Sequence, residues 1–116
     1  MKITFYGHAC LGIQIKDIHI LVDPFITGNE KASVINIETL KANYILVTHA
    51  HQDHTLDVET IAKRTGAVIV SNYEIVVHYQ GLGLEAHPMN HGGSWDFEFG
   101  NLKYVNAIHT SSFPDG

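Results

Sequence analysis

The segment at residues 47–54 holds the residues best suited to chemistry in this sequence. Three histidines and one aspartate lie within six positions: His49, His51, Asp53 and His54. Imidazole nitrogens and carboxylate oxygens are ligands that borderline divalent metals prefer. Residues two apart in an extended chain point to the same side, so His49 and His51 can bind one ion. Asp53 and His54 are offset toward a second ion, as two-metal hydrolytic sites require.

The alternative to a metal site is a chance cluster of surface histidines. The chain contains nine histidines, and random placement reproduces the spacing His-x-His-x-Asp-His roughly once in a few hundred such chains. An apolar run at residues 44–47 directly precedes the cluster and predicts a buried strand. A ligand loop at the end of a buried strand favours metal binding over chance.

Predicted strands and helices alternate around this loop. Helices are predicted on both sides of a strand that follows the loop, and the last predicted strand ends just before His109. Apolar runs and alternating patterns predict strands at residues 3–6, 11–15, 18–22, 44–48, 67–70, 84–89, 95–99 and 102–108. This order predicts an α/β fold.

Helical spacing of apolar residues begins directly after the loop. Val58, Ile61 and Ala62 lie at positions i, i+3 and i+4, which places them on one face of a helix. Asp57 is the candidate N-cap of this helix, and Gly66 is its stop. The second helix is predicted at residues 73–79.

Composition excludes several classes of protein. The chain has 116 residues, 45% of them hydrophobic and 16% charged, which predicts one small globular domain with its own core. The net charge is −5 and the few lysines and arginines are scattered, so no nucleic-acid partner is favoured. No apolar run approaches ~20 residues, so no membrane span is expected. The single cysteine, Cys10, excludes an internal disulfide and, with no signal peptide recognised, predicts a cytoplasmic protein.

The histidine loop resembles the signature of the metallo-β-lactamase superfamily. Residues 48–54 read THAHQDH, and this run is highly specific for that superfamily. Four flanking motifs resemble its small, poorly characterised branch of metal-dependent hydrolases: GHAC at 7–10, LVDPF at 21–25, MNHGG at 89–93 and HTSS at 109–112. The resemblance covers the whole chain and implies a four-layer αββα sandwich, of which residues 1–116 form the N-terminal half.

The resemblance also implies a ligand set. His49, His51 and His109 would bind a first divalent ion, and Asp53 and His54 a second; the alternative for His109 is a polar residue that closes a hairpin. One or two ions are expected, with Zn²⁺ preferred and Mn²⁺ or Fe²⁺ as alternatives. A bridging aspartate and one further histidine of the family pattern normally lie beyond this segment, so the chain alone is expected to be inactive or incomplete.

Three more residues are candidates for the surroundings of the metals. The resemblance implies that Asp23 supports the ligand loop from behind and that His8 lies near the pocket, without binding the metal directly. His91 lies in a glycine-rich loop that could flank the cleft. The alternatives are an Asp-Pro turn for Asp23, a backbone-bonded bend for His8 and an ordinary polar loop residue for His91.

The function that this pattern favours is metal-dependent hydrolysis. A metal lowers the pKa of its bound water toward neutrality, and Asp53 could hold the second ion or orient the water and take its proton. The expected substrate is a small ester, lactone, thioester or phosphodiester. Alternatives are a nuclease of the same superfamily, which needs a basic surface, and a non-catalytic metal-binding fragment. The exposed sheet face of a half-sandwich predicts that the missing C-terminal half, or another copy of the chain, covers it.

Overall fold

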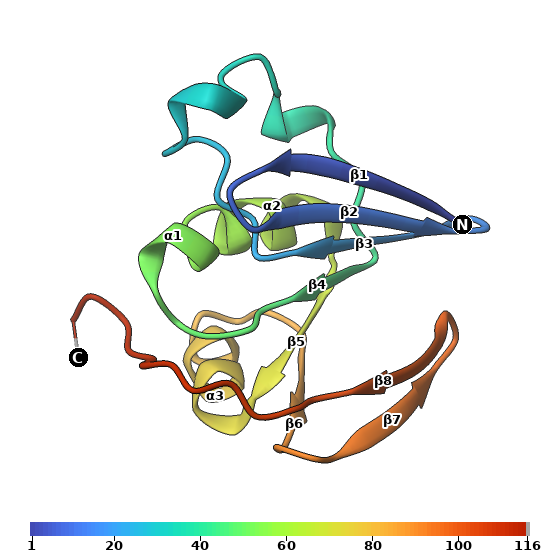
Figure 1. The fold of residues 1–116 in the computed structure, drawn as a ribbon, viewed down its shortest axis with the longest axis vertical. Helices are drawn as coiled ribbons and strands as arrows, with labels where there is room; N and C mark the ends of the chain where they lie inside the picture. The colour runs from blue at the N-terminus through green and yellow to red at the C-terminus, as the bar shows by residue number, and fades with distance from the viewer. Residues whose placement is uncertain (116) are drawn as a thin grey trace.

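The computed structural model describes residues 1–115 and is built on one six-stranded sheet (Figure 1). Gly116 lies outside the described residues. The strand order follows the sequence, with antiparallel pairing up to the third strand and parallel pairing after it. The strands are β1 (Lys2–Gly7), β2 (Cys10–Ile15), β3 (Ile18–Val22), β4 (Tyr44–Leu46), β5 (Val68–Asn72) and β6 (Ala86–Met89). The prediction of an α/β fold is confirmed.

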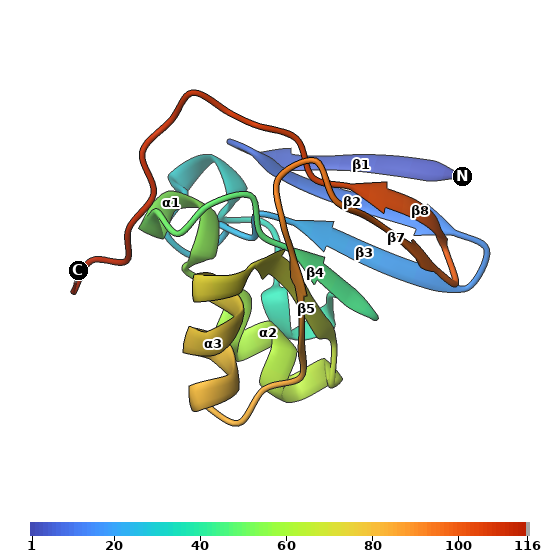
Figure 2. The same cartoon turned by 90° about the horizontal axis from the view of Figure 1, so that it is seen from below.

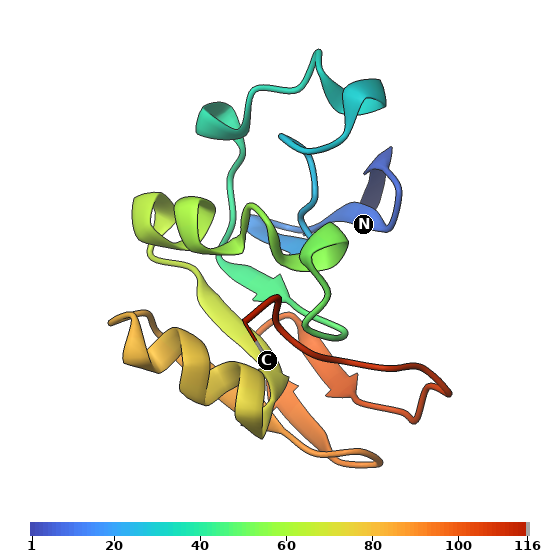
Figure 3. The same cartoon turned by 90° about the vertical axis from the view of Figure 1, so that its left-hand side faces the viewer.

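Helices cover one face of this sheet and a hairpin covers part of the other. Figure 2 and Figure 3 show α2 (Val58–Thr65) and α3 (Tyr73–Gly81) on one side and the hairpin of β7 (Ser94–Phe97) and β8 (Gly100–Lys103) on the opposite side. Three short elements complete the structure: η1 (Glu30–Ala32), η2 (Ile37–Thr39) and α1 (Gln52–Thr55). No helix in residues 1–115 has the length and apolar character that a membrane crossing needs.

The main core lies between α2 and the parallel strands. Val58, Ile61 and Ala62, which share the predicted face of α2, are each at most 2% exposed. They belong to one cluster with Ile45 of β4 and Ile69 of β5, which are fully buried. Burial of an aliphatic side chain of valine or isoleucine size stabilises a fold by about 1.5–3 kcal/mol. This layer therefore fixes the point where the chain leaves β4 and enters the histidine loop.

Asp57 precedes α2, as predicted, but its side chain does not cap that helix. The carboxylate instead accepts hydrogen bonds from the backbone N–H groups of Ile26 (2.6 Å) and Thr27 (2.9 Å) and from the Thr27 hydroxyl (2.5 Å). Asp57 is 3% exposed. The side chain turns away from the helix because these long-range donors satisfy it, and it fastens the loop after β3 to the start of α2.

The predicted final hairpin is longer than the observed one. β7 ends at Phe97 and β8 ends at Lys103, whereas strands were predicted to run to residues 99 and 108. β7 begins only at Ser94, so residues 105–108 have no strand opposite them to pair with. They start an irregular segment, residues 104–113, which we call the tail. The expectation that His109 lies just past a strand end is therefore wrong.

Candidate metal centre

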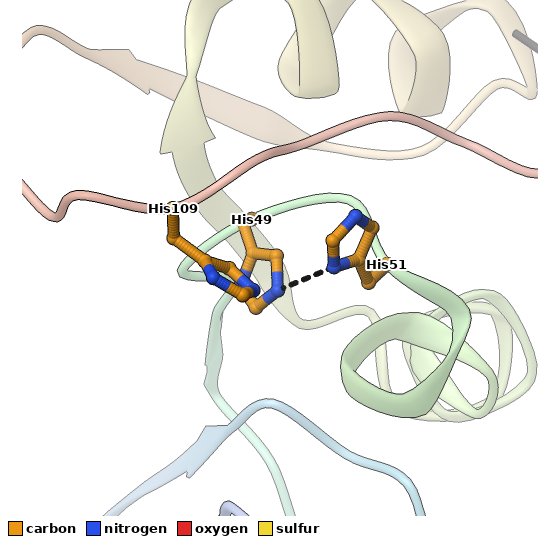
Figure 4. Close-up of side chains that lie close together, drawn as sticks. All are labelled: His49, His51 and His109. Atoms are coloured by element: carbon orange, nitrogen blue, oxygen red, sulfur yellow. Dashed lines mark hydrogen bonds between the residues drawn. The ribbon is translucent and has the colours of Figure 1, made fainter.

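The histidine loop joins β4 to α1 and presents alternate residues to one side. Val47 and Ala50 are at most 1% exposed and anchor the loop in the core, whereas His49 and His51 point away from it. His49 Nε2 lies 3.1 Å from His51 Nδ1 (Figure 4). The two imidazoles therefore share one side of the loop, as the spacing of two residues predicts.

His109 of the tail completes this group. Its ring centroid lies 4.7 Å from that of His49 and 5.2 Å from that of His51. One nitrogen from each of the three rings lies within 4.8 Å of the others. Figure 4 shows the three side chains converging from the loop and the tail. We call His49, His51 and His109 the first cluster.

Side chains on either side of His109 hold the tail against the sheet and the histidine loop. The Tyr104 hydroxyl lies within hydrogen-bond distance of two carbonyl oxygens, that of Val47 directly after β4 (2.9 Å) and that of Val70 within β5 (2.8 Å). The Ala50 N–H donates to Ser111 Oγ over 3.1 Å. Burial raises the pKa of Tyr104, so this hydroxyl remains a donor. The tail has no regular structure, so side-chain contacts such as these position His109.

A second group of donors lies beside the first. Asp53 and His54 come from α1, and His8 comes from the turn between β1 and β2. Asp53 Oδ2 lies 3.0 Å from His8 Nε2 and 3.9 Å from His54 Nε2. We call His8, Asp53 and His54 the second cluster. It adjoins the first, because the ring centroids of His49 and His54 are 4.1 Å apart.

Asp23 is buried behind both clusters. It is 2% exposed, and its carboxylate accepts from the Thr48 N–H (2.8 Å) and the Thr48 hydroxyl (2.7 Å) and contacts His54 Nδ1 (2.9 Å). A carboxylate can only accept, so His54 must carry its proton on Nδ1 and present the lone pair of Nε2. Such outer contacts orient metal-ligating histidines.

Thr48 extends this network to the first cluster. Its hydroxyl proton is directed to Asp23, so its oxygen can accept from His49 Nδ1 at 2.9 Å. His49 then keeps the lone pair of Nε2 for a ligand. One buried carboxylate therefore sets the tautomers of one histidine in each cluster.

The protonation states also suit metal binding. Burial, followed by the neighbouring His54 and His51, lowers the pKa of His49, so its imidazole is neutral at pH 7. Partial desolvation raises the pKa of Asp53, but its own backbone N–H and the His54 and His8 imidazoles outweigh this and lower it overall. A neutral imidazole and an ionised carboxylate are the forms that bind divalent metals.

The donor set fits a borderline divalent ion. The first cluster offers three imidazole nitrogens, and the second offers two imidazole nitrogens and one carboxylate oxygen. Zinc, manganese and iron all accept such ligands, whereas calcium and magnesium prefer oxygen donors alone. The chemistry of these side chains therefore supports a metal centre.

Some of the predicted residues come together and others do not. Seven of the eight predicted site residues are in the two clusters or directly behind them: His8, Asp23, His49, His51, Asp53, His54 and His109. His91 lies exposed in the turn between β6 and β7 and belongs to neither cluster. The supporting roles of Thr48, Tyr104 and Ser111 were not predicted. For Thr48 and Ser111 the only signal was their place beside ligand histidines.

Comparison with known proteins identifies the family. A model described as the metallo-beta-lactamase superfamily matches residues 3–113. The chain therefore belongs to the metallo-β-lactamase superfamily, which confirms the resemblance seen in the sequence.

Individual relatives lie in one branch of it. The chain is 71% identical over 117 residues to a UPF0173 metal-dependent hydrolase of Christiangramia forsetii, and 44% identical over 115 residues to one of Bacillus subtilis. The alignments cover 100% and 99% of this chain but 52% and 50% of those relatives. The chain thus spans about half the length of the curated relatives that it matches.

A solved structure has a similar fold. Igni18, described as a novel metallo hydrolase from the archaeon Ignicoccus hospitalis, superposes with a TM-score of 0.68 and 30% sequence identity. The superposition covers 80% of this chain and 41% of that one. The predicted metallo-β-lactamase fold is therefore confirmed for the part of the fold that this chain spans.

Proposed function

We propose that this chain carries the metal centre of a hydrolase that acts on a small ester, lactone, thioester or phosphodiester. The observation that supports this most is the pair of adjoining clusters, each with three donors, whose His49 and His54 rings lie 4.1 Å apart. Paired sites of this kind suit hydrolysis, because the nucleophile and the leaving group can each be stabilised by an ion. The names of the relatives, metal-dependent hydrolases, agree with this proposal.

The residues of the chain have separate tasks in this proposal. A bound divalent ion, for which Zn²⁺ is our first choice, supplies Lewis-acid chemistry by lowering the pKa of water and polarising a substrate oxygen. His49, His51 and His109 hold the first ion. Asp53 is half exposed on the open side of the second cluster, where its ionised carboxylate can bind an ion or accept a proton from water.

A cleft beside the second cluster has room for a small substrate. It measures about 880 Å³ and includes His8 and Phe25. Phe5 and Val34, which are 68% and 92% exposed, add apolar surface to it. This combination fits a small molecule with an apolar part. The net charge of −5 does not favour a nucleic acid, whose phosphates need basic side chains.

We propose further that residues 1–116 are the N-terminal half of a longer catalytic domain in the cytoplasm. Support comes from the relatives, of which the chain spans about half, and from the single cysteine, which fits a reducing compartment. The large apolar side chain of Ile3 on β1, which does not line that cleft, is 59% exposed. The rest of such a domain, or a second copy, would cover it.

The test is hydrolysis by the metal-loaded longer protein that contains this chain together with the other half of the domain. Assays with one ester, one lactone, one thioester and one phosphodiester should show turnover in at least one class, lost on chelation and restored by Zn²⁺ or Mn²⁺. His51→Ala should abolish that turnover, whereas His19→Ala, outside both clusters, should retain it. Bound metal without turnover on any of the four classes would contradict the proposal and favour a non-catalytic metal-binding fragment.

A further inference from the structure

We propose that His8 is a direct ligand of the second metal ion, together with Asp53 and His54. This inference rests on the proposed function only in requiring that the chain binds metal. The sequence predicted His8 as a residue of the pocket and not as a ligand. Its position in the structure supports the closer role.

Distances within the second cluster fit one ion. Asp53 Oδ2 lies 3.0 Å from His8 Nε2 and 3.9 Å from His54 Nε2, and all three donors lie within 4.8 Å of one another. Ligands arranged tetrahedrally about 2.1 Å from an ion lie about 3.4 Å from each other. Shifts of about 1 Å or less would bring the three atoms to these separations.

The backbone at Gly7 and His8 has an unusual conformation, which presents the imidazole ring of His8 to the second cluster. The pairing of β1 with β2 is irregular between Phe5 and Gly7, which ends the strand with φ +109° at Gly7. His8 follows with φ +52°, a left-handed conformation that non-glycine residues adopt uncommonly. Strain of this kind persists where the surrounding structure enforces it, often at functional sites.

Neighbouring rings keep the imidazole in place. The His8 ring makes edge contacts with Phe25, at a centroid distance of 5.6 Å, and with His54, at 5.2 Å. These contacts orient the His8 ring toward Asp53 in the metal-free chain, which lowers the entropic cost of metal binding.

The exposure of the second cluster suits a metal site that also takes ligands from outside this segment. His8 adds a third donor to Asp53 and His54, and the family pattern places a bridging aspartate and one further histidine beyond this segment. The side chains of His8 and Asp53 are 42% and 50% exposed, so such ligands, water or substrate can reach these donors.

Substitution of His8 by cysteine tests the proposal, because a thiolate bound to cobalt(II) has a characteristic absorption band. Cobalt(II) bound to a thiolate absorbs in the near ultraviolet by charge transfer, and this band requires a direct sulfur–metal bond. We expect cobalt-loaded His8→Cys to show the band. The wild type and His91→Cys should lack it, and both retain the fully buried Cys10 as a background control.

Metal binding by His8→Ala provides the second measurement. We expect this variant to retain the first ion and to bind the second more than ~100-fold more weakly, since loss of an outer contact alone costs 10–100-fold. Absence of the charge-transfer band in folded His8→Cys would overturn the proposal, as would a smaller loss in His8→Ala. If the wild type binds two ions and the His8 variants bind both with unchanged affinity, only this inference fails. If the wild type binds no ion, the proposed function fails as well.

Discussion

The two clusters share one loop and helix but obtain their third donors from opposite directions in the chain. The first cluster contains only imidazoles and is completed by His109 of the tail. The second contains a carboxylate and is completed by His8 in the turn between β1 and β2. His109 depends on hydrogen bonds from an irregular segment, whereas His8 depends on a strained hairpin turn.

This difference shows how a local motif gathers further donors from distant segments of the chain. The loop follows β4 at the carboxyl end of parallel strands, where ligands commonly bind in α/β folds. Its sequence supplies two donors to each cluster, and the fold supplies the third from a distant segment. Changes in the tail should therefore affect the first cluster alone, and changes in the hairpin turn the second.

The largest effect is expected from His51→Ala. Loss of a direct ligand should weaken the first ion by more than ~100-fold, beyond the 10–100-fold cost of losing an outer contact. The second ion should remain bound. Competition with a calibrated chelator measures both affinities, and His19→Ala on β3 is the control. Equal loss of both ions would show that the clusters do not act separately.

Asp23→Asn should weaken both ions by about 10–100-fold, because Asp23 contacts His54 directly and His49 through Thr48. The variant should also lose about 1–3 kcal/mol of unfolding free energy, since buried hydrogen bonds are broken. Asparagine tolerates the positive φ of +44° at this position, so backbone strain is not the cause.

Chelator competition and urea unfolding measure these two effects. Asp17→Asn, in the exposed turn between β2 and β3, is the matched control and should leave both quantities unchanged. A loss confined to one ion would contradict a shared role for Asp23.

Smaller effects are expected from loss of the Tyr104 or Ser111 hydroxyl, which help to hold the tail. Tyr104→Phe or Ser111→Ala removes a hydrogen bond worth about 1 kcal/mol, so the first ion should bind about 5-fold more weakly. The second ion should be unaffected. Ser111→Thr retains the hydroxyl and should restore binding. Titration calorimetry of each ion checks this, and equal weakening of both would refute a local role for the tail.

The smallest effect concerns pH in the metal-free chain. The pKa of His49 is lower in the folded chain than in the unfolded chain, where it is about 6.5. As the pH falls below about 6.5, the unfolded chain therefore binds more protons than the folded chain, and the free energy of unfolding should decrease until the pH passes the pKa of the folded state. Asp53 contributes a similar loss only below about 3.9.

Histidine-resolved NMR titration should find His49 protonating below the ordinary histidine range. Urea unfolding between pH 7 and 4.5 should show a smaller pH slope for His49→Asn than for the wild type. An identical slope in the two proteins would contradict the lowered pKa.

Local patterns made much of the site predictable. The spacing of His49, His51, Asp53 and His54 within one loop placed them side by side, and the spacing of apolar residues in α2 gave its buried face. These features depend on residues that are close in sequence. The strands β2 and β3 were similarly predictable, because alternation and a short turn specify a hairpin.

Local sequence patterns do not predict contacts between residues that are far apart in the chain. Asp57 looked like a helix cap, but donors about thirty residues earlier in the chain bind it instead. The last strand was predicted too long, because the sequence of residues 104–108 does not reveal that no partner strand lies opposite. The contact between His8 and Asp53 depends on an irregularity in β1 that propensities do not predict.

The most direct test of the two-cluster account is metal content. Elemental analysis of the purified chain, after loading with Zn²⁺ and removal of free ions, should give two equivalents. His51→Ala and Asp53→Ala should each give one equivalent, and the double variant none. A wild-type chain that retains no metal, or a single equivalent that both variants lose, would contradict the account.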